Sequence, residues 1–301
     1  MSPHLIQRVT ILGTGLIGGS FALALRKYTT DIRIAGWDRA EALREARSRQ
    51  IIDDAHHGDL APALRGADLI YIALPIGATL DLLPDIARLA PGHALITDAC
   101  STKVRITESA AELFSDGPIF LGGHPMAGKE VSGVAHADAD LFRGSTYALI
   151  ADSEQNPASA AEPESADSPQ DPRIAAFLKI LEKIGARPFW LGADQHDYAV
   201  GLASHLPQLA AVALGSFLYD RLDENGLPIT LAGPGLRDSL RLAGSPYSTW
   251  RDIVLTNKEM LSAALDLFAR RLDDLRDKLG SRELEADFDA ANELYKLLRG
   301  L

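Results

Sequence analysis

The chain is poor in cysteine and in positive charge. Its single cysteine, Cys100, excludes an intrachain disulfide and a zinc site built on cysteines, and we expect no metal site. The 30 Lys and Arg against 41 Asp and Glu give a net charge of −11, which disfavours nucleic acid and anionic membranes as partners. The sequence also lacks a signal-peptide pattern and a run of ~20 apolar residues, so we expect a cytoplasmic protein.

Short β-rich runs alternate with helical patterns through the first half of the chain. Strands are expected at VTIL, DIRIAGW, LIYIAL, HALITD, IFLGGHP and STYALI, and one more helix and strand at IAAFLKILEKIGARPFWLG. The alternation predicts an α/β fold, a Rossmann-type doubly wound parallel sheet over residues 1–192. Residues 151–173 contain no Val, Ile, Leu, Met, Phe, Trp or Tyr, and we interpret them as a flexible surface insert.

Strand signals disappear from about residue 193. The segment DYAVGLASHLPQLAAVALGSFLYDRL is apolar on almost every face and predicts a buried helix. Further on, Leu261, Leu265, Phe268 and Leu272 recur every three or four residues, as in an amphipathic helix. We therefore expect an all-helical domain over residues 193–301. It is small for so much apolar helix surface, and a homodimer would cover that surface.

Three glycines, Gly13, Gly15 and Gly18, form the pattern G-x-G-x-x-G. The pattern alone is weak, but here it follows an expected strand and opens an expected helix, as in dinucleotide-binding folds. The helix N-terminus would supply N–H groups and a positive dipole end for phosphates. The alternative is a structural glycine turn without a cofactor.

Asp38 lies 20 residues after Gly18, at the end of the second expected strand. A carboxylate at this place can bind a ribose 2′-hydroxyl and would repel a 2′-phosphate, which favours NAD. The neighbouring Arg39 keeps NADP possible. We assign the cofactor site to Gly13, Gly15, Leu16, Ile17, Gly18, Asp38, Arg39, Leu74 and Pro75.

Three later strands end in polar or glycine-containing segments, and ligands bind at the carboxyl ends of such strands. ALPIGA places Leu74 and Pro75 beside the expected cofactor, TDACSTK delivers Ser101 and Lys103, and GGHPMAG delivers His124. A neutral imidazole can accept a proton near pH 7, so His124 is the candidate base. The alternatives are a loop histidine satisfied by backbone groups and, for Ser101, a helix N-cap.

Five segments together resemble the prephenate/arogenate (cyclohexadienyl) dehydrogenase family of tyrosine biosynthesis. They are GLIGGSFALAL, TDACSTK, GGHPMAGKEVSGV, DYAVGLASHLP and RDSLRLAGSPYSTWRDI, in the same order as in the family. The resemblance covers nearly the whole chain apart from residues 151–173. It implies a dinucleotide-binding domain, a helical domain for substrate binding and dimerisation, and an NAD-dependent oxidative decarboxylation of prephenate, arogenate or both.

The resemblance also implies roles for particular residues. His124 matches the family's catalytic histidine, and Ser101 matches the serine that contacts that histidine and the substrate hydroxyl. Arg241 matches the substrate-binding arginine, while Ser204 and His205 match residues lining the same pocket. Trp250, Asp197 and Arg237 match supporting positions, and we interpret His196 as structural.

Two positions depart from the family pattern. Gln208 stands where many members have a second histidine, so it can bind substrate by hydrogen bonds but carries no charge, which leaves the choice of substrate open. Cys100 stands where a glycine is common. A different two-domain hydroxy-acid dehydrogenase and a non-catalytic NAD sensor remain as rivals, although the helix SHLPQLAAVAL lacks the lysine that the former would use.

Overall fold

The computed structural model describes residues 6–115, 117–129, 131–151, 171–222 and 226–300. Most of the insert predicted at 151–173 therefore lies outside the described residues. The chain divides into two compact units, which we call the first and second units. The first consists of Met1–Val200 and Gly244–Asn257, and the second of Gly201–Ala243 and Lys258–Leu301.

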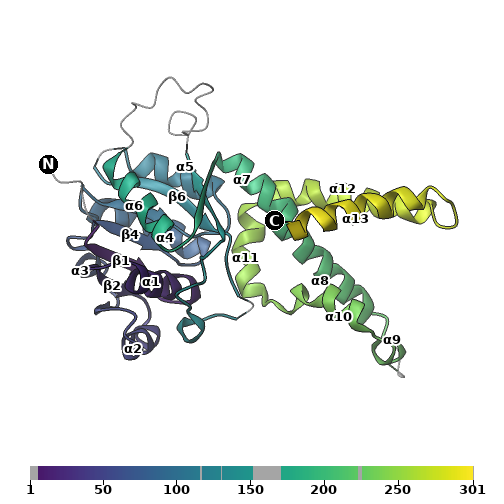
Figure 1. Cartoon of the computed structure of the whole chain (residues 1–301), viewed down its shortest axis with the longest axis horizontal. Helices are drawn as coiled ribbons and strands as arrows, with labels where there is room; N and C mark the ends of the chain where they lie inside the picture. Colours follow the sequence, from purple (N-terminus) through teal and green to yellow (C-terminus); the bar gives the residue numbers. More distant parts are fainter. Residues whose placement is uncertain (1–5, 116, 130, 152–170, 223–225, 301) are drawn as a thin grey trace, which may run out of the picture. The chain divides into compact units, whose positions relative to one another are not determined.

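Eight strands form one sheet among the described residues of the first unit (Figure 1). They are β1 (Arg8–Leu12), β2 (Arg33–Trp37), β3 (Asp54–His56), β4 (Leu69–Ile72), β5 (Leu95–Asp98), β6 (Ile119–Pro125), β7 (Thr146–Ile150) and β8 (Arg187–Leu191). Their order is β3-β2-β1-β4-β5-β6-β7-β8, and all pairs are parallel except β6 with β7. The predicted doubly wound sheet is confirmed.

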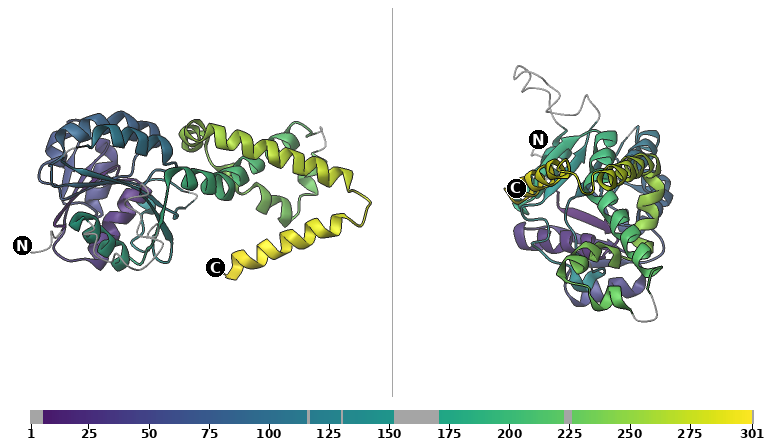
Figure 2. Two further views of the ribbon diagram at one scale, coloured as in Figure 1. Left: turned by 90° about the horizontal axis from the view of Figure 1, so that it is seen from above. Right: turned by 90° about the vertical axis from the view of Figure 1, so that its right-hand side faces the viewer.

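Helices cover both faces of this sheet (Figure 2). Those of the first unit are α1 (Leu16–Tyr28), α2 (Ala40–Ser48), α3 (Ala61–Leu64), α4 (Ile76–Leu89), α5 (Val104–Leu113), α6 (Pro172–Lys183), α7 (Ala193–Val200) and α11 (Tyr247–Thr256), with a 3₁₀ turn at Val134–His136. Two of them, α7 and α11, come from the part of the sequence in which only a helical domain was expected.

The strands alternate between two buried apolar clusters. Ile11 and Tyr71 point to the face covered by α1 and α6, where Phe21 stacks on Tyr71 with ring centroids 4.0 Å apart. Leu12 and Ile72 point to the opposite face, covered by α3 and α4. Burial on both faces explains why these strands read as continuous apolar runs rather than as alternating ones.

The second unit is helical in its described part. It contains α8 (Leu206–Tyr219), α9 (Leu227–Thr230), α10 (Pro234–Leu240), α12 (Lys258–Asp277), α13 (Leu284–Gly300), a π-helical turn at Gly201–His205 and most of a 3₁₀ turn at Leu242–Gly244. The π turn precedes Pro207, which has no N–H for the carbonyl four residues earlier. The helical second half that the sequence predicted is confirmed.

The burial predicted for the long apolar helix is wrong within a single chain. Helix α8 packs against α10 and α12, yet Val212, Leu214 and Phe217 are exposed. On α13 no residue is buried, and its apolar side chains face solvent. The sequence pattern shows that faces of α8 and α13 are apolar, but it does not show which surface covers them.

Candidate active site

The glycine loop joins β1 to α1 and passes very close to other backbone. A Cβ on Gly18 would lie 1.9 Å from the carbonyl oxygen of Gly13, so only glycine fits there. A Cβ on Gly15 would meet no atom within 4 Å, although Gly15 caps the N-terminus of α1. The protein itself therefore leaves open space at the helix end, where N–H groups point outward, and a pyrophosphate fits this place. Leu16 and Ile17 are the half-buried first residues of α1.

Asp38 follows β2 and holds the glycine loop. Its Oδ2 accepts hydrogen bonds from Thr14 N at 2.7 Å and Thr14 Oγ1 at 3.0 Å, and its Oδ1 accepts one from Arg39 N at 2.7 Å. Asp38 is half-buried and Arg39 is exposed. The carboxylate thus lies beside the glycine loop, where a nucleotide ribose is bound in this type of fold.

The segment after β4 is tied to α11. Pro75 caps α4, and Asp252 on α11 accepts a hydrogen bond from Gly77 N at 3.0 Å. The adjacent Arg251 guanidinium, with the Gly77 amide, holds the pKa of Asp252 below its usual range. Half-buried Leu74 offers its carbonyl to the Cys100 thiol at 3.8 Å, which links this segment to the one after β5.

Cys100 fills the position where the family pattern has glycine. Its thiol also contacts Thr79 Oγ1 at 3.4 Å, and the residue is 3% exposed. Burial raises the pKa of Cys100 to about 12. The side chain therefore acts as a packed, neutral group and not as a nucleophile.

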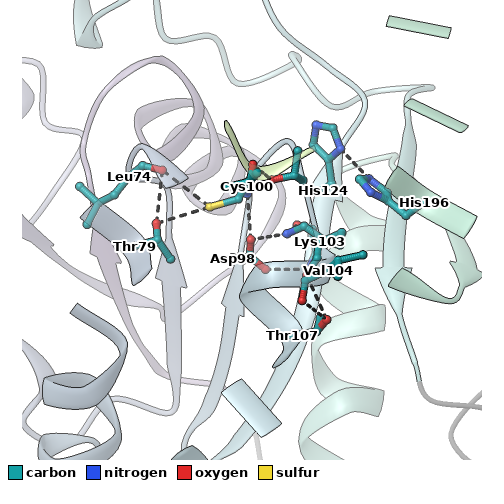
Figure 3. Close-up of polar contacts among 12 residues, drawn as sticks. Leu74, Thr79, Asp98, Cys100, Lys103, Val104, Thr107, His124 and His196 are labelled. Carbon is teal, nitrogen blue, oxygen red and sulfur yellow. Dashed lines mark hydrogen bonds and ion pairs between the residues drawn. The ribbon is translucent and has the colours of Figure 1, made fainter. Parts of the chain in front are cut away.

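A buried ion pair fixes the segment before His124 (Figure 3). Lys103 Nζ bonds Asp98 Oδ2 and donates to Gly123 O at 2.7 Å, and both charged side chains are 0% exposed. Asp98 also accepts from Cys100 N at 2.9 Å and Gly123 N at 3.0 Å. Lys103 lies at the strand end where the sequence placed it, but its buried ammonium group holds the ends of β5 and β6 together.

His124 lies within β6, not in a loop, and pairs with Ala148 of the antiparallel β7. Its Nδ1 lies 2.9 Å from His196 Nε2, and His196 Nδ1 lies 2.8 Å from Asp197 Oδ1. Figure 3 shows the two rings side by side at the end of the strand, with His196 coming from α7. His196 and Asp197 are buried, whereas His124 is half-buried.

Asp197 also binds the N-terminus of α5. Its Oδ1 accepts from Lys103 N at 2.7 Å and its Oδ2 from Val104 N at 3.0 Å. The N-cap residue of α5 is Lys103, so the alternative that Ser101 caps this helix is wrong. Ser101 is half-buried in the segment between β5 and α5.

The remaining predicted site residues belong to the second unit. Ser204 is exposed and His205 is buried, both on the π-helical turn, and Arg241 is exposed at the end of α10. Gln208 is buried, and its Nε2 donates to Leu242 O at 2.9 Å. Gln208 therefore fastens α8 to the residue that follows Arg241.

Sequence reasoning missed the contribution of His196 and gave Asp197 only a supporting place. The signal was present, since adjacent His and Asp residues lie in the helix that follows the last strand of the sheet. Local pattern gave no reason to join them to His124, which lies 72 residues earlier. Trp250, the other supporting residue of the first unit, is half-buried and packs with Ile76, Cys100 and Ile253.

Comparison with known proteins gives consistent matches over both units. A family model of the prephenate dehydrogenase nucleotide-binding domain matches residues 21–162, and one of the prephenate dehydrogenase dimerization domain matches residues 192–299. A prephenate dehydrogenase of Lactococcus lactis subsp. cremoris is 35% identical over 93% of this chain and 73% of its own length. A cyclohexadienyl dehydrogenase of Zymomonas mobilis is 29% identical over 92% of this chain and 90% of its own length.

Solved structures agree with these matches. Prephenate dehydrogenase from Aquifex aeolicus, in complex with hydroxyphenyl propionate and NAD+, superposes with a TM-score of 0.83 at 27% identity, covering 97% of each chain. Arogenate dehydrogenase from Synechocystis gives a TM-score of 0.78 at 27% identity, covering 97% of this chain and 99% of that one.

Fold and site together define an NAD-dependent oxidoreductase. This class is indicated by the glycine loop, Asp38 and the histidine at the strand end. The matches to both domain models narrow the assignment to one family of such enzymes. The chain belongs to the prephenate dehydrogenase family. The expected enzyme class and cofactor are confirmed, and the rival hydroxy-acid dehydrogenase and NAD sensor are set aside.

Proposed function

We propose that this enzyme oxidises prephenate to 4-hydroxyphenylpyruvate, arogenate to tyrosine, or both, with loss of carbon dioxide. NAD accepts the hydride from the ring carbon that carries the hydroxyl group. The observation that carries the proposal is the His124 imidazole at the end of β6, in a sheet whose glycine loop lies at the same edge. Carboxyl ends of parallel strands meet at one edge, so base and nucleotide site belong to one crevice of the first unit.

In this proposal His124 takes the proton of the substrate hydroxyl as the hydride leaves. Removing that proton relieves the positive charge that develops on the carbinol carbon. Loss of carbon dioxide then leaves its bonding electrons in the ring, which becomes aromatic, and the proton can return to the ring oxygen. Ser101 is proposed to contact the same hydroxyl group.

The nucleotide is proposed to lie along the glycine loop, with its ribose at Asp38. Gly15, Leu16 and Ile17 would face its pyrophosphate, while Gly13 allows the tight turn and Gly18 the close packing of α1 on β1. Leu74 and Pro75, with Arg39 near the ribose, would complete the site. Asp38 favours NAD because its carboxylate would repel a 2′-phosphate.

The substrate carboxylates require a cation, which we assign to Arg241, with Ser204, His205 and Gln208 lining the same pocket. A guanidinium can hold a carboxylate through two parallel hydrogen bonds. The bond from Gln208 to Leu242 O supports a fixed backbone beside Arg241. We expect Arg241→Lys to raise the KM for the dienyl acid at least ~10-fold, because Lys lacks the planar fork, while the Kd for NAD stays unchanged.

NADH formation tests the reaction directly. The purified protein should reduce NAD when prephenate or arogenate is added. In parallel assays with NADP as the oxidant, reduction should be slower. Turnover with one acid alone would assign the preference that Gln208 leaves open. Tight NAD binding without turnover of either acid would contradict the proposed function.

We propose a homodimer formed through the second unit. Helix α13 has the exposed apolar side chains Phe288, Leu294, Tyr295, Leu297 and Leu298. The expectation that no stretch is long and apolar enough to span a membrane is wrong by length and composition, because Ala193–Tyr219 meets that test, and only 28% of its apolar window is buried. A second copy covering these faces explains both features in a protein that we place in the cytoplasm.

Light scattering coupled to gel filtration tests the dimer. Twice the chain mass of 32.3 kDa is expected. Replacing Leu297, which is 67% exposed on α13, by Lys should shift the protein towards monomer. A wild-type chain that elutes as a monomer at micromolar concentration would contradict the dimer.

A further inference from the structure

The hydrogen bonds around His124 form a chain that starts at Asp197. An ionised carboxylate can only accept hydrogen bonds. Asp197 accepts three of them, two from amides at the N-terminus of α5, where the helix dipole stabilises negative charge. Its third donor, at 2.8 Å, is therefore the Nδ1–H group of His196.

A neutral imidazole carries one proton, so His196 Nε2 then holds a lone pair. This nitrogen lies 2.9 Å from His124 Nδ1, and two lone pairs cannot face each other at that distance. His124 must therefore donate from Nδ1, which leaves the lone pair of its ring on Nε2. The ring arrangement, edge to face with centroids 5.1 Å apart, suits such a bond.

We propose that Asp197 and His196 are positioning residues that hold His124 in the tautomer with its proton on Nδ1 and its lone pair on Nε2. In this form Nε2 can take the hydroxyl proton of the substrate. In the other tautomer Nε2 would already carry a proton, and His124 could not act as the base through that atom. This inference rests on the proposed role of His124.

A hydrogen bond also holds the backbone of the His196–Asp197 pair. Asn257, which follows α11, donates its side-chain Nδ2 to Asp197 O at 2.9 Å. His196 and Asp197 are 1% and 4% exposed, so water does not compete for their hydrogen bonds. The arrangement supports one orientation of the His196 ring.

The tautomer itself can be measured without turnover. Long-range ¹H–¹⁵N correlation spectra of the ¹⁵N-histidine-labelled protein with NAD, near pH 8, separate protonated from unprotonated ring nitrogens. The His124→Asn and His196→Gln variants assign the two spin systems. We expect the proton on Nδ1 of both rings. A proton on Nε2 of His124, or protons on both nitrogens of His196, would overturn the proposal.

Kinetics of two substitutions give the second test. His196→Leu removes the acceptor for the Nδ1–H group of His124, and we expect kcat to fall ~10–100-fold. This loss is smaller than the ~10⁴-fold cost of a wrong histidine tautomer in serine proteases, because part of the His124 population still has its proton on Nδ1. The KM values and the Kd for NAD should change less than ~3-fold. His196→Gln can present an amide oxygen to His124 and should recover at least ~3-fold of the loss.

His93 offers a matched control, since it pairs with Asp68 at 3.4 Å near the opposite end of β5. His93→Leu and His93→Gln should leave kcat unchanged. A His196→Leu enzyme as active as wild type, or a Gln variant no better than Leu, would overturn the proposal. An inactive wild type with the expected tautomers would instead contradict only the proposed reaction.

Discussion

Replacing Lys103 by Met tests how strongly the buried ion pair with Asp98 stabilises the ends of β5 and β6, next to His124. The ammonium group bonds the Asp98 carboxylate and Gly123 O, and neither charged side chain has any exposed surface. The substitution leaves the Asp98 charge with only two backbone donors in a buried place. Breaking one partner of such a pair costs about 3–5 kcal/mol, against a total stability of about 5–15 kcal/mol.

Urea unfolding followed by circular dichroism and by loss of NAD binding measures this cost. With a slope of about 2–3 kcal/mol per M, the midpoint should fall by roughly 1–2.5 M. The activity should fall too, because Gly123 precedes His124. Lys179→Met, at an exposed position of α6, is the control and should change the midpoint little.

A double variant identifies the cause of the loss. Asp98→Asn combined with Lys103→Met removes the uncompensated charge, so it should be more stable than Lys103→Met alone. A Lys103→Met protein that loses less than ~1 kcal/mol would refute the argument. So would a double variant whose losses simply add.

Two further predictions follow from the shifted pKa values. Because burial raises the pKa of Cys100 to about 12, iodoacetamide at pH 8 should label the folded protein far more slowly than the urea-unfolded protein, and equal rates would contradict the burial. Asp252→Ala should destabilise the protein by ~1 kcal/mol at pH 7 through loss of its bond to Gly77 N. Because folding lowers the pKa of Asp252, its contribution to the free energy of unfolding is present above the unfolded pKa of ~4 and is lost as the pH falls through the folded pKa. The stabilities of wild type and Asp252→Ala should therefore converge in acid. A stability difference that does not change with pH would be inconsistent with this reasoning.

The sheet was largely predictable, because buried parallel strands form apolar runs that glycine and proline separate. The edge strand β3 was missed: it has only three residues, Asp54–His56, and none of them is buried. The membership of α11 in the first unit was also not predictable. An amphipathic pattern shows that a face is buried, whereas the partners that bury it, such as Ile76 and Ile106, lie roughly 150–175 residues away in sequence.

The site was predictable where one local motif carries the chemistry, as at Gly18 and His124. It was not predictable where residues from distant segments meet. The sequence places Lys103 after a strand end, and only the fold shows that its ammonium group is buried against Asp98. His196 looked structural, because nothing in the sequence places α7 against the end of β6.

The central claim is that His124 is the base of a dehydrogenase in the prephenate dehydrogenase family. Single-turnover NADH formation with prephenate and with arogenate, for wild type and for His124→Asn, tests it most directly. We predict that the variant binds NAD with unchanged Kd while hydride transfer falls ~10²–10⁴-fold with every acid that the wild type accepts. Hydride transfer at the wild-type rate in His124→Asn would contradict the account.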